Sequence, residues 1–264
     1  MRLKIAHRTE YRYDAPVPYL LQRLRLFPAS GRTQTVMSWT LDIEGAREEV
    51  RFVDHFGNDT RLLSVEGGPD FIAVEAAGEV VTRDNSGVFG PHQGFTPLWL
   101  FSRGTALTEI GDGIRDLAAA AAGGSEIERL HKLMGAIGER VAYKPGATST
   151  VTTAEEALAL KTGVCQDHSH IFVAAARAMG FPARYISGYL MMDAAVEQAA
   201  SHAWAEAHVP GLGWVAFDPA NGISPDERYV RVAAGRDYRD AMPVSGIRLG
   251  QSQEQLAVTV TVEQ

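Results

Sequence analysis

Short runs of alternating apolar and polar residues dominate residues 3–83 of the chain. Runs such as LKIAHRTEYRY, TQTVMSWTLDI and DFIAVEAAGEVVT are rich in β-branched and aromatic residues, and segments such as ASG, GND and GGPD separate them. Alternation with a period of two is typical of strands that bury one face, and the separating segments are typical of turns. The pattern therefore predicts an N-terminal β-rich domain over residues 1–85.

A Gly- and Pro-rich segment with scattered aromatic residues follows at residues 86–104, and we expect it to be a linker that packs against its neighbours. Beyond it the apolar spacing becomes helical. Ser125 and Thr153 each open a capping-box pattern, in which a glutamate three residues later bonds back to the cap N–H. The predicted helices cover residues 105–122, 153–161 and 165–180, and a further helix begins at Ser125. The predicted strands cover residues 182–190, 201–209, 213–219 and 256–264.

This order of elements defines the expected fold class. Helices followed by antiparallel strands indicate an α+β fold for residues 105–264, not a doubly wound parallel sheet. We expect helices packed on an antiparallel sheet as the core, preceded by the β-rich domain.

Composition removes several function classes. With 25 Lys and Arg against 32 Asp and Glu, the formal charge of −7 disfavours nucleic acids and anionic membranes as partners. The single cysteine excludes an intramolecular disulfide, and no nucleotide-binding or metal-protease motif is present, so we expect no cofactor and no metal. Charges interrupt the N-terminal apolar residues and no apolar run reaches about 18 residues, which predicts a soluble cytoplasmic protein. The sequence leaves the oligomeric state open.

The one cysteine, Cys165, lies where the Gly163 break meets the start of a predicted helix. Unpaired N–H groups and the positive end of the helix dipole stabilise a thiolate at such a position, which suits a nucleophile. Position alone equally allows a buried cysteine that only packs.

The following hairpin supplies the groups that a thiolate nucleophile needs. In SHAWAEAHV, strict alternation puts His202, Trp204, Glu206 and His208 on one face of a strand and alanines on the other. If the hairpin turns about Pro210, Asp218 on the next strand lies directly opposite His202, within reach of its imidazole. A cysteine, a positioned histidine and an orienting carboxylate form the constellation that acyl transfer through a thioester requires. Each residue alone also has a purely structural interpretation, with Asp218 as a turn residue and His202 bonded to a backbone carbonyl.

The segments GVCQDHSH, RAMGFPARYISGY, SHAWAEAHVPGLGWVAFDP and GRDY together resemble the transglutaminase-like superfamily of cysteine enzymes, in its bacterial branch with an extra N-terminal β-domain. VDHFGN, at residues 53–58, resembles a motif of that N-terminal domain. The resemblance implies a papain-like α+β core, with Cys165 as the nucleophile, His202 as general base and acid, and Asp218 as the residue that orients the histidine.

One departure concerns the oxyanion. Animal transglutaminases carry, upstream of the nucleophile, a tryptophan that stabilises the oxyanion. This chain has Arg129 in the comparable region. We expect the Cys165 N–H to be one donor and the Tyr143 hydroxyl to be the second, although a surface role for Tyr143 is equally open.

The predicted activity is that of a cysteine protease or amidase acting on a peptide or protein. Transglutaminase activity with an amine acceptor and a non-catalytic protein-binding module are the alternatives. His168 and His170 lie two apart on a helix and so point to different faces, which argues against a metal site, and His170 is expected to pack near the cysteine. Glu206 and His208 are expected at a rim or in solvent.

Overall fold

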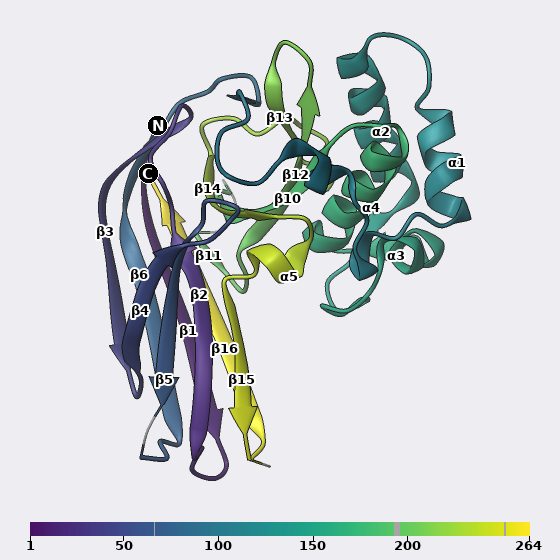
Figure 1. The fold of residues 1–264 in the computed structure, drawn as a ribbon. Helices are drawn as coiled ribbons and strands as arrows, with labels where there is room; N and C mark the ends of the chain where they lie inside the picture. Colours follow the sequence, from purple (N-terminus) through teal and green to yellow (C-terminus); the bar gives the residue numbers. More distant parts are fainter. Residues whose placement is uncertain (66, 193–195, 251) are drawn as a thin grey trace.

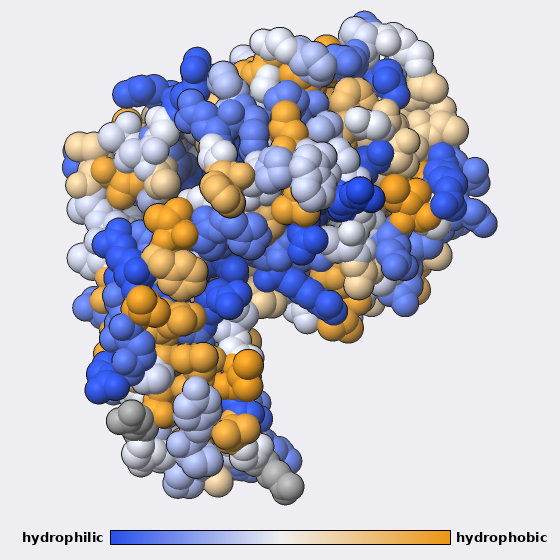
Figure 2. Space-filling model, viewed as in Figure 1, coloured by the Kyte–Doolittle hydropathy of each residue, from blue (hydrophilic) through white to orange (hydrophobic). Residues whose placement is uncertain are grey.

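The computed structural model describes residues 1–65, 67–192, 196–250 and 252–264, and it contains a β-sandwich and a mixed α+β core that lie side by side (Figure 1). The sandwich projects beyond the core as an arm (Figure 2). Within the described ranges, no helix is long and apolar enough to cross a lipid bilayer.

Two antiparallel sheets form the sandwich. In spatial order, the first sheet contains β11 (Glu197–Gln198), β16 (Glu254–Glu263), β1 (Arg2–Tyr13), β6 (Phe71–Thr82) and β3 (Gln34–Glu44). The second contains β15 (Val244–Leu249), β2 (Tyr19–Phe27), β5 (Asp59–Val65) and β4 (Arg47–Val53).

The odd-numbered residues of β1 face inward, as the alternating pattern predicted. Leu3 and Ile5 pack against the core, whereas Tyr11 and Tyr13 pack against the second sheet of the sandwich. The inner face of the first sheet therefore packs against the core at one end and against the second sheet at the other.

The core consists of an antiparallel sheet covered by helices. The sheet has the order β14 (Tyr229–Gly235), β10 (Ala183–Leu190), β12 (His202–Val209), β13 (Gly213–Phe217) and β7 (Val88–Gly90). The helical elements are η1 (Leu98–Ser102), η2 (Ala106–Thr108), α1 (Asp112–Ala120), α2 (Glu126–Arg140), α3 (Ala154–Leu160), α4 (Cys165–Ala178) and α5 (Tyr238–Ala241). A short parallel pair, β8 (Ala142–Tyr143) and β9 (Thr162–Gly163), lies before α4.

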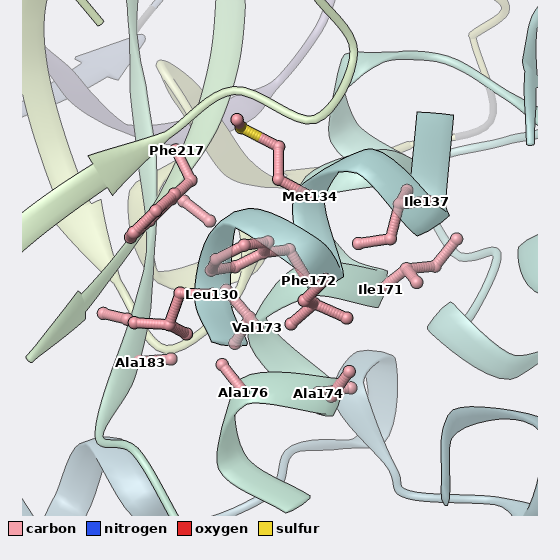
Figure 3. Close-up of a cluster of buried hydrophobic side chains, with 14 of the residues drawn as sticks. Leu130, Met134, Ile137, Ile171, Phe172, Val173, Ala174, Ala176, Ala183 and Phe217 are labelled. Carbon is pink, nitrogen blue, oxygen red and sulfur yellow. The ribbon is translucent and has the colours of Figure 1, made fainter. Parts of the chain in front are cut away.

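Helix α4 is the centre of this core (Figure 3). Its Phe172 stacks on Phe217 of β13 at 5.0 Å, and Leu130 and Ile137 of α2 belong to the same hydrophobic cluster. The small residues Ala205 and Ala207 of β12 let the helix lie close to the sheet. This packing holds the N-terminus of α4, and hence Cys165, in a fixed place.

Most predicted helices are present, and the first one begins late. Both capping boxes form, with the Ser125 and Thr153 side chains accepting the N–H groups of Glu128 and Glu156. Residues 105–122 do not form one helix: η2 precedes α1, which starts at Asp112. The α1 terminus is capped by Glu155 of α3, whose carboxylate accepts the N–H groups of Gly113 and Ile114 at 2.7 and 3.1 Å. Such a tertiary cap leaves no local pattern.

The last two strands lie in the sandwich. The sequence predicts a core over residues 105–264, but β15 pairs with β2 and β16 pairs with β1. Alternation predicts that a segment is a strand and which residues share a face, and it carries no information on which distant strand is the partner. The chain thus leaves the sandwich, builds the core and returns.

The VDHFGN segment joins the two parts. Asp54 orders its turn by accepting the N–H groups of Phe56 and Asn58 at 2.9 and 3.0 Å. The Asn58 amide then bonds the backbone of Ala234 in β14 in both directions, each at 2.8 Å. The motif is therefore a clamp between the sandwich and the core sheet.

Candidate active site

Cys165 is the first residue of α4, as predicted, and is partly exposed. Two neighbours fix this helix start. The buried Asp167 carboxylate accepts the Val164 N–H at 2.8 Å and the Thr148 hydroxyl at 2.6 Å. A Cβ on Gly163 would lie 2.7 Å from the Asp167 Cβ, so only glycine fits at this position, two residues before the cysteine. The Cys165 N–H belongs to the first turn, where no carbonyl of the same helix can accept it.

The structure brings Cys165, His202 and Asp218 together. His202 begins β12 and its Nε2 lies 2.7 Å from Asp218 Oδ2, with both side chains buried. The Cys165 sulfur lies near the same imidazole, and its interaction with the ring helps to raise the pKa of His202. Since Nε2 faces the carboxylate, Nδ1 is the ring nitrogen left for the sulfur.

The hairpin register differs from the predicted one. Val209 pairs with Gly213 and Ala205 with Phe217, so the turn is centred on Gly211 and not on Pro210. The prediction that His202 and Asp218 lie directly opposite each other was therefore wrong by two residues. A shift of two keeps both side chains on one face because the strand period is two, and the imidazole reaches the carboxylate diagonally.

Asp218 is held by a set of donors that the sequence analysis did not identify. Tyr229 on β14 donates its hydroxyl to Oδ2 at 2.8 Å, and the Asn221 amide donates to the same oxygen at 2.7 Å. The N–H groups of Ala220 and Asn221 donate to Oδ1 at 3.1 and 3.3 Å. Asn221 lies three residues beyond Asp218 in a turn, which is a local signal, whereas Tyr229 requires knowledge of the sheet.

These contacts shift both protonation equilibria toward an ion pair. Burial by itself would lower the pKa of His202, but the hydrogen bonds to Asp218 and Cys165 outweigh burial and raise it to about 10. Burial would raise the pKa of Asp218, and the donors around its carboxylate, His202 first, hold it below the usual value. The imidazole is consequently charged at neutral pH beside a sulfur and a carboxylate.

Tyr143 lies beside the cysteine, on β8. Burial, followed by the Cys165 and Asp218 charges and a hydrogen bond with Cys165, raises the pKa of Tyr143 to about 12, so its hydroxyl keeps its proton. His168 ties this strand to the helix start, because its two ring nitrogens face the carbonyl oxygens of Val164 and Val141 at 2.9 Å each. Arg129 is engaged elsewhere, over the Phe181 ring.

Of the other residues that the sequence singled out, some lie where they were predicted and one does not. His170 is fully buried, as expected, and accepts the Tyr238 N–H at 3.1 Å. Trp204 is buried and stacks on the His202 ring at 6.2 Å. Glu206 does not meet solvent: it is buried between Arg184 and Arg231, because these residues on β10 and β14 face the same side of the sheet. His208 is half-buried against Trp214.

Among the described residues, no group of three His, Cys, Asp or Glu side chains is arranged to hold a metal ion. The fold and this site define an α+β protein of papain-like arrangement, in which a thiol at a helix N-terminus faces a buried histidine and aspartate from the adjoining sheet.

Comparisons with known proteins identify the family. The model of the transglutaminase-like superfamily matches residues 115–219, and that of the bacterial transglutaminase-like N-terminal region matches residues 3–81. An uncharacterized protein of Mycobacterium tuberculosis is 30% identical over 274 residues, which cover 93% of this chain and 87% of the relative. One of Mycobacterium leprae is 29% identical over 280 residues, covering 99% and 98%.

A solved structure confirms the expected fold. The crystal structure of a candidate cysteine protease from Cytophaga hutchinsonii superimposes with a TM-score of 0.78 at 21% identity, covering 100% of this chain and 91% of that one. The chain belongs to the transglutaminase-like superfamily and carries the bacterial N-terminal region of that family.

Proposed function

We propose that this protein is a thiol hydrolase that cleaves an amide bond of a peptide or protein through a thioester on Cys165. The observation that carries the proposal is the buried His202–Asp218 pair at 2.7 Å, with the Cys165 sulfur close enough to the imidazole to help raise its pKa. A buried packing cysteine has no need of a charged histidine, whereas a nucleophile does.

In the first half-reaction, the Cys165 sulfur forms a bond to the carbonyl carbon and the carbonyl electrons move to oxygen. The C–N bond then breaks as His202 donates its Nδ1 proton to the leaving nitrogen, which departs as an amine. Asp218 holds the ring so that this nitrogen faces the sulfur and the substrate. In the second half, His202 takes a proton from water and the hydroxide attacks the carbonyl carbon of the thioester. The C–S bond then breaks, the product leaves as a carboxylic acid, and the Cys165 thiolate and the protonated His202 are restored.

The negative oxygen formed in each half needs donors. The Cys165 N–H and the Tyr143 hydroxyl flank the sulfur and are our assignment for this role. The raised pKa of Tyr143 supports it, because a phenol that stays protonated can donate throughout the cycle.

The same thioester can pass to a primary amine, which would make the protein a transglutaminase. Water and amine acceptors are separated by mass spectrometry of a protein substrate incubated with the enzyme, with and without cadaverine. Hydrolysis yields cut peptide bonds or glutamine converted to glutamate in both samples, and transamidation adds cadaverine to glutamine.

Thiol labelling tests the shared chemistry without a known substrate. We expect iodoacetamide to alkylate Cys165 rapidly at pH 6, and His202→Ala to slow that reaction at least about tenfold, since the imidazolium that supports the thiolate is gone. His208→Ala, on the same strand, is the matched control and should leave the rate unchanged. Slow labelling in the parent, equal to that of His202→Ala, would contradict the proposal and favour the binding module.

A further inference from the structure

A crevice of about 140 Å³ opens between the sandwich and the core, beside the candidate active site. Thr9 and Tyr11 of β1 and Leu256 and Val258 of β16 form its sandwich side. It lies where the inner face of the first sheet passes from the core to the second sheet. Its lining residue Tyr238 belongs to α5, which Figure 1 shows between the sandwich and the core. The β-rich domain thereby contributes to a hollow of the catalytic part.

The core side of the crevice is formed by residues that adjoin both reacting groups. Ser201, which lines it, directly precedes His202. Tyr238, which also lines it, packs in the same cluster as Cys165. When the carbonyl carbon of a substrate contacts the Cys165 sulfur, a neighbouring side chain of that substrate can therefore reach this crevice.

The lining defines the chemistry of the occupant. None of the described residues that line the crevice is an Asp, Glu, Lys or Arg. Its histidine, His7, is buried and engaged on both nitrogens, with the Tyr189 hydroxyl at 3.0 Å and the Thr9 hydroxyl at 3.3 Å. A charged side chain that enters the crevice would lose part of its hydration and would meet no counter-ion among these lining residues. A cavity of about 150 Å³ accommodates a benzene ring, so the volume suits one ring or one branched aliphatic group.

We propose that this crevice is the specificity pocket of the enzyme and binds an uncharged leucine- or phenylalanine-like side chain next to the scissile amide. The inference rests on the proposed thiol chemistry and adds the substrate class. It also gives the β-sandwich a role in choosing the substrate.

Irreversible probes test the pocket through Cys165 itself. A set of N-acetyl dipeptidyl vinyl sulfones carries Leu, Phe, Lys or Glu at each of the two positions in turn, and mass spectrometry gives the second-order rate of Cys165 modification. At one position, we expect the leucyl and phenylalanyl probes to react at least about tenfold faster than the lysyl and glutamyl probes.

Leu256→Glu places a charge at the crevice without burying it, because Leu256 is 56% exposed. It should reduce the leucine-over-lysine ratio at least about fivefold, since the new carboxylate attracts the lysyl probe and repels none of the apolar ones. Thr259→Glu is the matched control: Thr259 is exposed on the opposite face of β16, paired with Arg8, and its variant should keep the parent ratio.

The outcomes separate the two proposals. Fast iodoacetamide labelling with equal rates for all four probes overturns the pocket and leaves the thiol chemistry standing. A leucine preference that Leu256→Glu leaves intact also overturns the pocket, because selection then occurs elsewhere. Slow, His202-independent iodoacetamide labelling overturns both proposals.

Discussion

Strand β12 carries two buried ionic groups four residues apart. At its start, His202 pairs with Asp218 and faces the Cys165 sulfur. Further along, Glu206 accepts Arg184 at 2.6 Å and Arg231 at 3.1 Å. Both groups have shifted protonation equilibria, so a buried, shifted group does not by itself identify a catalytic site. The difference is that the described partners of Glu206 are the cations Arg184 and Arg231, whereas His202 keeps one nitrogen for the sulfur that we propose as the nucleophile.

Removing the reactive atom should separate the two groups most strongly. Cys165→Ala abolishes the thioester route, and we expect amide turnover to fall by about 10⁴- to 10⁶-fold. Steady-state assay of the purified variant on a cleaved peptide measures this, with circular dichroism to show that the fold is kept. Undiminished turnover would refute the assignment of the nucleophile.

The next largest effect should come from Asp218→Asn. The amide cannot hold the imidazole with its proton on the correct nitrogen, and we expect kcat to fall by about 10³- to 10⁴-fold. Asn221→Ala removes only one of the donors to that carboxylate and should reduce kcat by less than about tenfold. Equal losses of kcat in the two variants would mean that activity depends on the turn at residues 218–221 and not on the charge of Asp218.

The contrast on β12 shows what the sequence could and could not predict. Cys165 at a helix start and His202 on the face of Asp218 follow from the glycine break and from a period of two, which are local properties. The two-residue register shift did not affect that conclusion. Glu206 was misplaced because its partners Arg184 and Arg231 lie on strands whose order in the sheet no local pattern encodes. Tyr229, the capping by Glu155 and the return of β16 to β1 were missed for the same reason.

Tyr143→Phe sharpens the assignment of the oxyanion donors. Deleting one donor to a developing oxyanion typically costs about 10²- to 10³-fold in kcat, and the half-exposed phenol of Tyr143 is expected at the lower end. KM should change little, because the bond forms in the transition state. The measurement is a kcat and KM comparison with Tyr19→Phe, an exposed tyrosine in the sandwich, and a kcat equal to that of the parent would return Tyr143 to a surface role.

Glu206→Gln should affect stability and leave the chemistry nearly intact. The buried Arg184 and the partly buried Arg231 lose their counter-charge, and breaking a buried ion pair typically costs about 3–5 kcal/mol of unfolding free energy. We expect a lower denaturation midpoint in urea and an iodoacetamide rate at Cys165 within about threefold of the parent. Glu75→Gln breaks the exposed pair with Arg8 and should cost less than about 1 kcal/mol. A collapse of labelling in Glu206→Gln would show that the two groups are coupled.

The smallest expected difference between the His202 and Glu206 groups is the direction in which their contributions to stability depend on pH. The pKa of His202 is raised to about 10, so its contribution to stability is complete below the unfolded value near 6.5 and is lost as pH rises toward 10. Burial would raise the pKa of Glu206, but Arg184 and Arg231 lower it below its ordinary value. Its contribution is therefore complete above about pH 4.5 and is lost as pH falls further.

Differences in Tm between parent and variant isolate these two contributions from all other titrating groups. The gap between the parent and His202→Gln should narrow between pH 7 and 10, and the gap between the parent and Glu206→Gln should narrow below pH 4.5. For a chain of this size, each kcal/mol corresponds to about 2–4 °C. If the His202 gap were constant up to pH 10, the imidazole would be neutral in the folded protein. The pair with the Cys165 sulfur would then lack the charge on which the proposed chemistry depends.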